Sequence, residues 1–226
     1  MVTDLLSQAI HPQTNTTRST DPTMRLYIVR HGETDFNRNR MMQGYHEIPL
    51  NERGIRQATL LAHRLKEEQL DRIICSDLRR AVMTACIVAS HTGVPMDYDP
   101  ALRERDPGLL TGKSYDAEPR FFTDIDFIPP EGEGVRAFRS RVRQAFEDLA
   151  ARAHHATERV AVITHGLVCH AFVTEFFGED AAEGIGSRNA ALTLAEYDAG
   201  QWSLVARDCA SHLAGEEPPR IVVAGA

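Results

Sequence analysis

A histidine and an arginine stand side by side where a short apolar run ends. The run Leu26–Val29 leads directly into Arg30, His31 and Gly32. An imidazole can act as a nucleophile, and a guanidinium presents a planar fork of donors that fits a phosphate or a carboxylate. Because the end of a strand fixes where both side chains point, this pair predicts a site that holds an anion beside a nucleophile.

A second histidine follows a second apolar run. Val160–Thr164 leads into His165 and Gly166. The glycine after each histidine permits a sharp turn or a close approach of the backbone to a ligand. A third run, Arg72–Ser76, precedes a helix start that contains Arg80, where backbone N–H groups attract anions. Since ligands of open α/β sheets bind beyond the carboxyl ends of the strands, we expect the three strand ends to form one site.

These residue types favour phosphoryl transfer through a histidine. A neutral imidazole nitrogen attacks phosphorus and gives a covalent phosphohistidine, which water then cleaves. Arginines neutralise the phosphoryl oxygens as charge spreads over them. The leaving alkoxide needs a proton, so a carboxylic acid with a raised pKa must lie nearby. Glu104 is the candidate acid, and Glu33, Asp77 and Asp106 compete with it for this role.

The elements that must position these residues alternate along the chain. Nearly continuous apolar runs predict buried strands over Leu26–Arg30, Arg72–Ser76 and Val160–Thr164. Apolar residues at helical spacing predict helices over residues 51–69, 77–91, 135–154 and 167–177. Two further runs, 192–197 and 202–206, predict a hairpin of antiparallel edge strands. This alternation is typical of a layered α/β domain with a mostly parallel sheet.

The pattern also predicts three details of this organisation. The apolar face of the first helix is expected to include Ile55, and that of the second helix Cys86. The least regular stretch, Leu109–Gly134, is expected to be a lid or an insertion over the site. Residues 1–24 are predicted to form a flexible tail, because much of this stretch is too polar to bury surface, and 25–226 a single domain.

The composition excludes several classes of protein. With 226 residues, 42% hydrophobic and 25% charged, the chain is typical of a soluble globular protein. A net charge of −7 argues against a nucleic-acid partner, and no segment has the apolar length that spans a bilayer, so we expect no membrane partner. The four cysteines lie far apart with no C-x-x-C pair, which favours free thiols and a cytoplasmic protein.

The motifs, taken in order, resemble the histidine phosphatase superfamily, also called the phosphoglycerate mutase-like family. The resemblance extends from Leu26 to about Leu213, and its blocks are Arg30–Thr34, Asn37 with Gln43-Gly44, Ser76–Ala81, Leu102–Glu104 and Val162–Gly166. It implies a three-layer α/β/α sandwich and a reaction that needs neither a metal ion nor a cofactor.

The resemblance also implies roles for individual residues. His31 would be the nucleophile and Glu104 the general acid, which later acts as the base for water. Arg30, Arg80 and His165 would hold the phosphoryl group, with Asn37 assisting. Secondary contributions would come from four residues beside these: Thr34, Gln43, Gly44 and Gly166.

Some positions depart from the common pattern of the family. They are Phe36, Glu47, Pro107 and Gly134, and they concern the surroundings of the substrate more than the phosphate pocket. The resemblance therefore predicts the catalytic chemistry but leaves the identity of the substrate, a small phosphorylated metabolite, open.

Four functional interpretations follow. The leading one is a metal-independent phosphatase. The alternative is a phosphoglycerate mutase-type transfer, which the short segment between Gly112 and Gly132 disfavours because a less covered site admits water. A non-catalytic phospho-ligand-binding domain would not need an acid. A metal site on His31, His165 and Glu104 is disfavoured, because the neighbouring arginines would oppose the ion. Oligomeric state is left open, a homodimer included.

Overall fold

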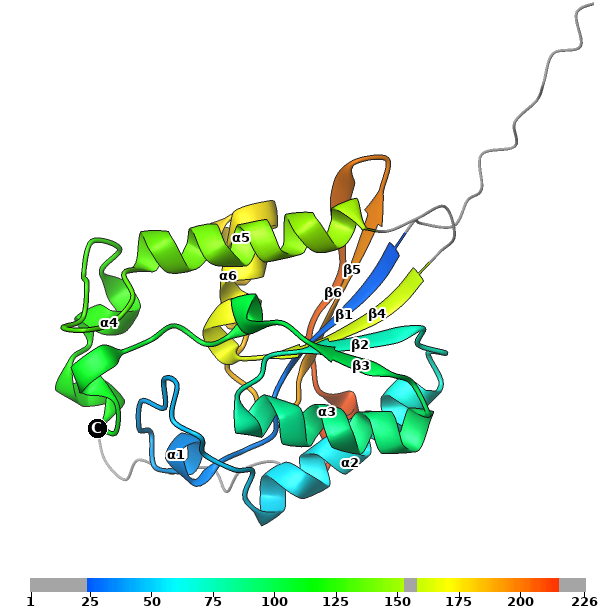
Figure 1. The fold of residues 1–226 in the computed structure, drawn as a ribbon, viewed down its shortest axis with the longest axis horizontal. Coiled ribbons are helices and arrows are strands. Elements are labelled where there is room, and N and C mark those ends of the chain that lie inside the picture. The colour runs from blue at the N-terminus through cyan, green and yellow to red at the C-terminus, as the bar shows by residue number, and fades with distance from the viewer. Residues whose placement is uncertain (1–23, 153–157, 216–226) are drawn as a thin grey trace, which may run out of the picture.

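A six-stranded sheet forms the centre of the molecule (Figure 1). The computed structural model describes residues 24–152 and 158–215, so the expected N-terminal tail lies outside the described residues, apart from Met24. The strands are β1 (Met24–Arg30), β2 (Arg72–Cys75), β3 (Met96–Tyr98), β4 (Glu158–Thr164), β5 (Leu192–Asp198) and β6 (Gln201–Cys209). Their order is β3-β2-β4-β1-β5-β6. The first four in this order are parallel to one another, and β5 and β6 add the expected antiparallel hairpin.

The register of the two central strands places both histidines together. β1 and β4 pair in parallel with Arg30 opposite Thr164, so His31 and His165 leave the same edge of the sheet as neighbours. The backbone N–H of His31 continues the ladder by donating to the Thr164 carbonyl oxygen at 2.9 Å. The end of the ladder therefore fixes the backbone at the candidate nucleophile.

Helices cover both faces of the sheet, which confirms the three-layer α/β/α sandwich (Figure 1). One layer contains α2 (Glu52–Lys66) and α3 (Arg79–Thr92), whose buried residues pack with Tyr27 and Val29 of β1. The other contains α5 (Val135–Ala151) and α6 (Gly166–Phe177), whose buried residues pack with Leu26 and Ile28. Because successive strand residues point to opposite faces, the one strand β1 contributes to both cores.

Short helical turns make up the remaining elements. They are α1 (Asp35–Arg38), η1 (Pro100–Leu102), η2 (Gly108–Leu110), η3 (Tyr115–Ala117), α4 (Arg120–Thr123), α7 (Glu179–Ala182) and η4 (Ser211–Leu213). Three of them, η2, η3 and α4, lie in or at the edge of the stretch predicted to be irregular. Figure 1 shows α4 on the side of the molecule where α1 lies, far from the β5–β6 hairpin.

The structure corrects a few expectations. Ile55 is 42% exposed, because it lies roughly a quarter-turn away from the face that carries Ala58, Leu61 and Leu65. Cys86 is also exposed, beside the edge strand β3, where its Sγ lies 4.0 Å from Met96 Sδ. The edge strand β3 was not predicted, because three residues are too few to show an alternation of apolar and polar side chains. The last residues of the predicted helix 135–154 fall outside the described part.

Two further observations concern the class of protein. None of the helices in the described ranges is long and apolar enough to cross a membrane. The four cysteines, all of them described, form no disulfide, as the sequence predicted.

Candidate active site

His31 has one unprotonated ring nitrogen. Its side chain is 2% exposed, and Nδ1 lies 2.7 Å from the carbonyl oxygen of Gly32. A carbonyl oxygen can only accept, so Nδ1 carries the proton and donates it in this hydrogen bond. The other ring nitrogen, Nε2, is then unprotonated and accepts a hydrogen bond from Arg80 Nε at 3.3 Å. The tautomer is therefore the one in which Nε2 can act as a nucleophile.

The surroundings of His31 also keep its ring uncharged. Burial lowers the pKa of His31 well below its ordinary value, and the positive charges of Arg80 and Arg30 lower this pKa further. The hydrogen bond to Gly32 acts in the opposite direction but does not outweigh these effects. Since a protonated imidazole has no lone pair to donate, the lowered pKa favours the reactive form at neutral pH.

Arg80 lies in the first turn of α3 and is almost completely buried. Besides contacting His31, it donates from Nη1 to the carbonyl oxygen of His46 at 3.1 Å and from Nη2 to that of Gly44 at 2.9 Å. Burial lowers the pKa of Arg80 to about 10, so this guanidinium is still a cation at neutral pH. The loop with Gly44 thus holds Arg80 against the nucleophile. Gly44 itself has φ +48°, and a Cβ there would come 2.4 Å from Pro107 Cδ.

His165 lies beside His31, with the two ring centroids 5.2 Å apart. Its Nε2 lies 2.8 Å from Ser76 Oγ, and this hydroxyl also accepts from the backbone N–H of Leu78. The serine hydroxyl can therefore give its single proton to Nε2, which leaves Nδ1 as the protonated nitrogen of a neutral ring. Within the described part of the chain, the buried Nδ1 atom has no hydrogen-bond partner.

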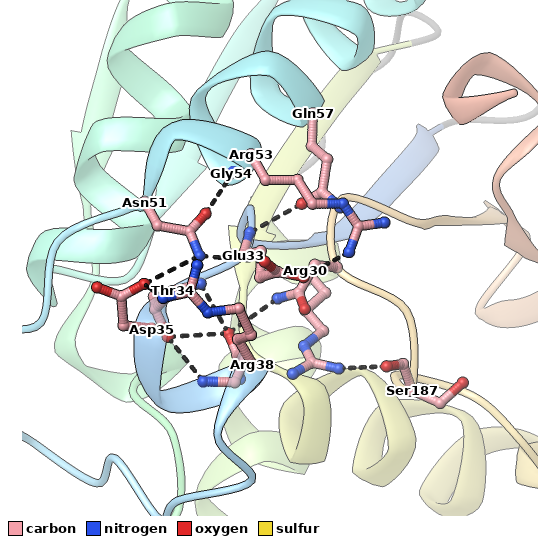
Figure 2. Close-up of polar contacts among 12 residues, drawn as sticks. Arg30, Glu33, Thr34, Asp35, Arg38, Asn51, Arg53, Gly54, Gln57 and Ser187 are labelled. Atoms are coloured by element: carbon pink, nitrogen blue, oxygen red, sulfur yellow. Dashed lines mark hydrogen bonds and ion pairs between the residues drawn. The ribbon is translucent and has the colours of Figure 1, made fainter. Parts of the chain in front are cut away.

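Arg30 is held by the loop that precedes β5. Its Nη1 donates to the carbonyl oxygens of Gly186 at 2.8 Å and Ser187 at 2.6 Å, and Figure 2 shows the contact with Ser187. Close packing at Gly166 supports this arrangement, because a Cβ at Gly166 would lie 2.7 Å from the Gly186 oxygen and 3.4 Å from Arg30 Nε. Among the described residues, no acceptor pairs with the buried Arg30 Nε.

Two buried nitrogens of this site thus lack partners, Arg30 Nε and His165 Nδ1. Leaving a buried donor unpaired costs about 1–3 kcal/mol, so such groups are rare without a functional reason. Both can donate to an oxygen of an anion bound beside His31. The arrangement fits a tetrahedral oxyanion, such as a phosphoryl group, better than it fits a neutral ligand.

Glu104 approaches the site from the loop after η1. Its carboxylate accepts from the backbone N–H groups of Arg105 at 3.0 Å and of Leu167, at the start of α6, at 3.3 Å. Burial raises the pKa of Glu104, and these two hydrogen bonds with the charges of Arg80 and Arg30 offset only part of the rise. A carboxyl with a raised pKa keeps its proton to a higher pH, as a general acid must.

The competing acids have other partners. Glu33 pairs with Arg53 at 2.7 Å and accepts from Asn51 at 3.0 Å, as Figure 2 shows. Asp77 forms a two-pronged ion pair with Arg103. Asp106 accepts the backbone N–H of Gly108. Glu104 is the carboxyl whose raised pKa and coupling to Arg80 and Arg30 fit the role of the acid.

Asn37 is part of a polar cluster next to His31. Thr34 caps α1, and its backbone N–H donates to Asn37 Oδ1 at 3.2 Å. The hydroxyl of Thr34 donates to Gln43 Oε1 at 2.9 Å. Asn189 Nδ2 donates both to Asn37 Oδ1 at 3.1 Å and to the carbonyl oxygen of His31 at 3.0 Å. The amide oxygen of Asn37 is therefore occupied, and its NH₂ group is the part that can face a ligand.

The structure brings the predicted residues together and adds two that sequence reasoning missed. The predicted residues in or beside this site are Arg30, His31, Thr34, Asn37, Gln43, Gly44, Arg80, Glu104, His165 and Gly166. Ser76 was noted as a strand end and as the start of a family block but was given no role, although it contacts His165 directly. Asn189 lies in an irregular loop before β5, where no local pattern marks it.

Comparison with known proteins assigns the chain to one family. The sequence model of the histidine phosphatase superfamily (branch 1) matches residues 26–209. The chain therefore belongs to the histidine phosphatase superfamily, and its relatives are enzymes named as mutases or phosphatases.

Individual relatives carry both kinds of name. The Yersinia pestis protein "Probable phosphoglycerate mutase GpmB" is 31% identical over 198 residues, which is 79% of this chain and 87% of the relative. The phosphoglycerate mutase structure from Bacillus anthracis has a TM-score of 0.76 and 25% identity, and covers 88% of this chain and 99% of its own. A mycobacterial glucosyl-3-phosphoglycerate phosphatase has a TM-score of 0.71 and 27% identity, covering 82% of this chain and 99% of its own.

Proposed function

We propose that this chain hydrolyses a small phosphomonoester through a covalent phosphohistidine on His31 Nε2. The observation that carries the proposal is the hydrogen bond from Nδ1 to Gly32, which leaves Nε2 as a lone pair among cations. Superfamily membership and relatives named as phosphatases support it.

In the first step, His31 Nε2 attacks phosphorus. The N–P bond forms as the bond from phosphorus to the ester oxygen breaks, and Glu104 gives its proton to the leaving oxygen. Arg30, Arg80 and His165 donate hydrogen bonds to the phosphoryl oxygens, where negative charge is spread in the transition state.

In the second step, water replaces the histidine. The Glu104 carboxylate, now deprotonated, takes a proton from the attacking water. The O–P bond forms as the N–P bond breaks, and the electron pair returns to His31 Nε2. Inorganic phosphate then leaves, and both residues are back in their starting protonation states.

The proposed reaction uses arginines where other phosphatases use metal ions. Across residues 24–152 and 158–215, no group of three or more His, Cys, Asp or Glu side chains is placed to hold an ion. We expect full turnover of p-nitrophenyl phosphate in the presence of EDTA. Strict dependence on an added divalent cation would overturn the metal-independent mechanism.

Phosphoglycerate mutase-type transfer is the second candidate, and the names of the mutase relatives favour it. It would use the same residues but return the phosphoryl group to another hydroxyl. Incubation with 3-phosphoglycerate and 2,3-bisphosphoglycerate separates the two. We expect phosphate release, whereas rapid isomerisation without phosphate release would establish the mutase.

The decisive experiment for the mechanism traps the phosphoenzyme. The enzyme is mixed with a ³²P-labelled phosphomonoester, and the reaction is quenched rapidly without acid. The protein should then carry a label that is stable in base and lost in acid. His31→Ala should carry no label and show no turnover. If His31→Ala kept its turnover, His31 could not be the nucleophile.

A further inference from the structure

Arg141 of α5 donates three hydrogen bonds to the loop that carries Glu104 and two to Glu133. Its Nη1 donates to the carbonyl oxygens of Ala101 at 2.8 Å and Arg103 at 2.9 Å, and Nη2 donates to that of Glu104 at 3.4 Å. The remaining two bonds go to the Glu133 carboxylate, from Nε at 3.0 Å and from Nη2 at 2.7 Å. An arginine has five N–H groups, so its hydrogen-bonding capacity is filled.

Glu133 connects this loop to the segment that precedes α5. Its backbone N–H donates to the carbonyl oxygen of Asp106 at 2.8 Å, and its own carbonyl oxygen accepts from Arg105 Nε at 2.7 Å. Arg105 is only 3% exposed and also donates to the carbonyl oxygens of Phe121 and Phe127. The residue after the candidate acid is thus fixed to three points of residues 121–133.

This network determines where the carboxyl group of Glu104 can be. The backbone of Glu104 rests on Arg141, and one carboxylate oxygen accepts from the backbone N–H of Arg105. Ordinary loop flexibility would otherwise let the carboxyl group move, and a displacement of about 1 Å can cost roughly a hundredfold in rate. Charged donors on backbone carbonyls form some of the stronger hydrogen bonds in proteins.

We propose that Arg141 and Glu133 are positioning residues that hold Glu104 where it can protonate the leaving group, and that Arg105 couples this position to residues 121–133. The proposal rests on the proposed function, since it concerns the proton that passes from Glu104 to the leaving oxygen as the P–O bond breaks. It would also give residues 121–133 a role in positioning the acid.

The test compares leaving groups within one enzyme preparation. An alkyl phosphate needs a proton from the acid, whereas p-nitrophenyl phosphate loses a stable anion and needs it much less. For Glu133→Gln we expect kcat/KM on glycerol 2-phosphate to fall by roughly tenfold or more relative to kcat/KM on p-nitrophenyl phosphate. The ratio does not depend on how much of the preparation is folded, so partial unfolding cannot imitate this result.

Glu179→Gln is the matched control. Glu179 accepts a hydrogen bond from Arg139, another arginine of α5, at 2.9 Å, in an ion pair away from the acid loop. Its loss should leave the ratio of the two substrates at the wild-type value. Arg141→Lys provides a second variant should Glu133→Gln fail to fold, because a lysine keeps the charge but offers at most three donors.

Glu104→Gln is the reference variant, because it removes the acid itself. It separates the assignment of Glu104 as the acid from the proposal that Arg141 and Glu133 position it. If it shifts the ratio while both Glu133→Gln and Arg141→Lys keep the wild-type ratio, Glu104 is the acid but the positioning proposal is wrong. If Glu104→Gln leaves the ratio unchanged, the acid is misassigned and the positioning proposal fails with it. An inactive wild-type enzyme would instead overturn the proposed function itself.

Discussion

Arg80 Nε lies 3.3 Å from His31 Nε2, so the candidate nucleophile accepts a hydrogen bond from a cation. The lone pair that would attack phosphorus is the one that Arg80 contacts. A phosphoryl oxygen is a better acceptor for the guanidinium than an imidazole nitrogen is, because it is charged. Binding of the phosphoryl group would thus turn Arg80 towards the substrate and release Nε2 at the same time.

The first prediction concerns Arg80→Gln. The positive charge of Arg80 helps to lower the pKa of His31, so its removal should raise that pKa towards the ordinary value. The imidazole must be neutral to attack, so the acid limb of the kcat/KM profile should move to higher pH. We also expect kcat to fall by roughly 10²–10³-fold, as when one donor to a charged transition state is lost. A pH profile of the variant checks both, and an unmoved acid limb would contradict the coupling.

The second prediction concerns the basic limb of the same profile. Burial raises the pKa of Glu104, so its acid form persists above the ordinary range and disappears as the pH rises further. Wild-type kcat/KM on an alkyl phosphate should therefore decline at high pH. Glu104→Gln cannot titrate and should show a lower rate, by roughly 10²–10⁴-fold, without this decline. A basic limb that persists in the variant would assign it to another group.

The third prediction concerns Ser76→Ala. The change removes the hydrogen-bond partner of His165 Nε2, so His165 is no longer held as an Nδ1–H donor. We expect weaker competitive inhibition by inorganic phosphate, by roughly tenfold, consistent with losing one hydrogen bond to a charged group. Ser90→Ala is the control, since its exposed hydroxyl donates to the Ile87 carbonyl oxygen away from the site. Equal inhibition constants for the two variants would rule out this role for Ser76.

The fourth prediction concerns folding stability. Burial and neighbouring arginines lower the pKa of both His31 and His165 well below the ordinary value, so the native state binds fewer protons than the unfolded state at acidic pH. The contribution of these two histidines to the free energy of unfolding is then fully present above the histidine pKa of the unfolded chain, about 6.5, and falls as the pH drops below that value. Urea unfolding between pH 7.5 and 5.0 should show this loss, and His165→Gln should reduce its slope. If His165→Gln had the same slope as the wild type, groups other than His165 would dominate the pH dependence of stability.

Much of the fold could be predicted because its strong signals are local. The apolar runs before His31 and His165 predicted two of the central strands, and helical spacing located α2, α3, α5 and α6. The edge strand β3 could not be found, since its pairing with β2 rather than its own sequence makes it a strand. The intrinsic β-strand propensity of three residues is too weak to compete with such tertiary contacts.

The site residues also differ in whether a local pattern marks them. His31 and His165 could be paired in advance because both follow strands, whereas Ser76 and Asn189 gain their roles from contacts across the fold. The choice of Glu104 over Glu33 and Asp77 depends on which carboxyls are matched by arginines, and ion-pair partners far apart in the chain leave no local pattern.

The ladder between β1 and β4 has a consequence for how such an enzyme can diversify. The His31 amide donates to the Thr164 carbonyl oxygen where the two central strands end, so the sheet fixes the backbone of the nucleophile. The connection between β3 and α5 carries Glu104 together with Arg105 and Glu133, so the proposed acid is held by side-chain contacts instead. Substitutions on that connection would move the proposed acid while the backbone of the nucleophile stays in place, so the preference for one leaving group over another can change without any change to the sheet.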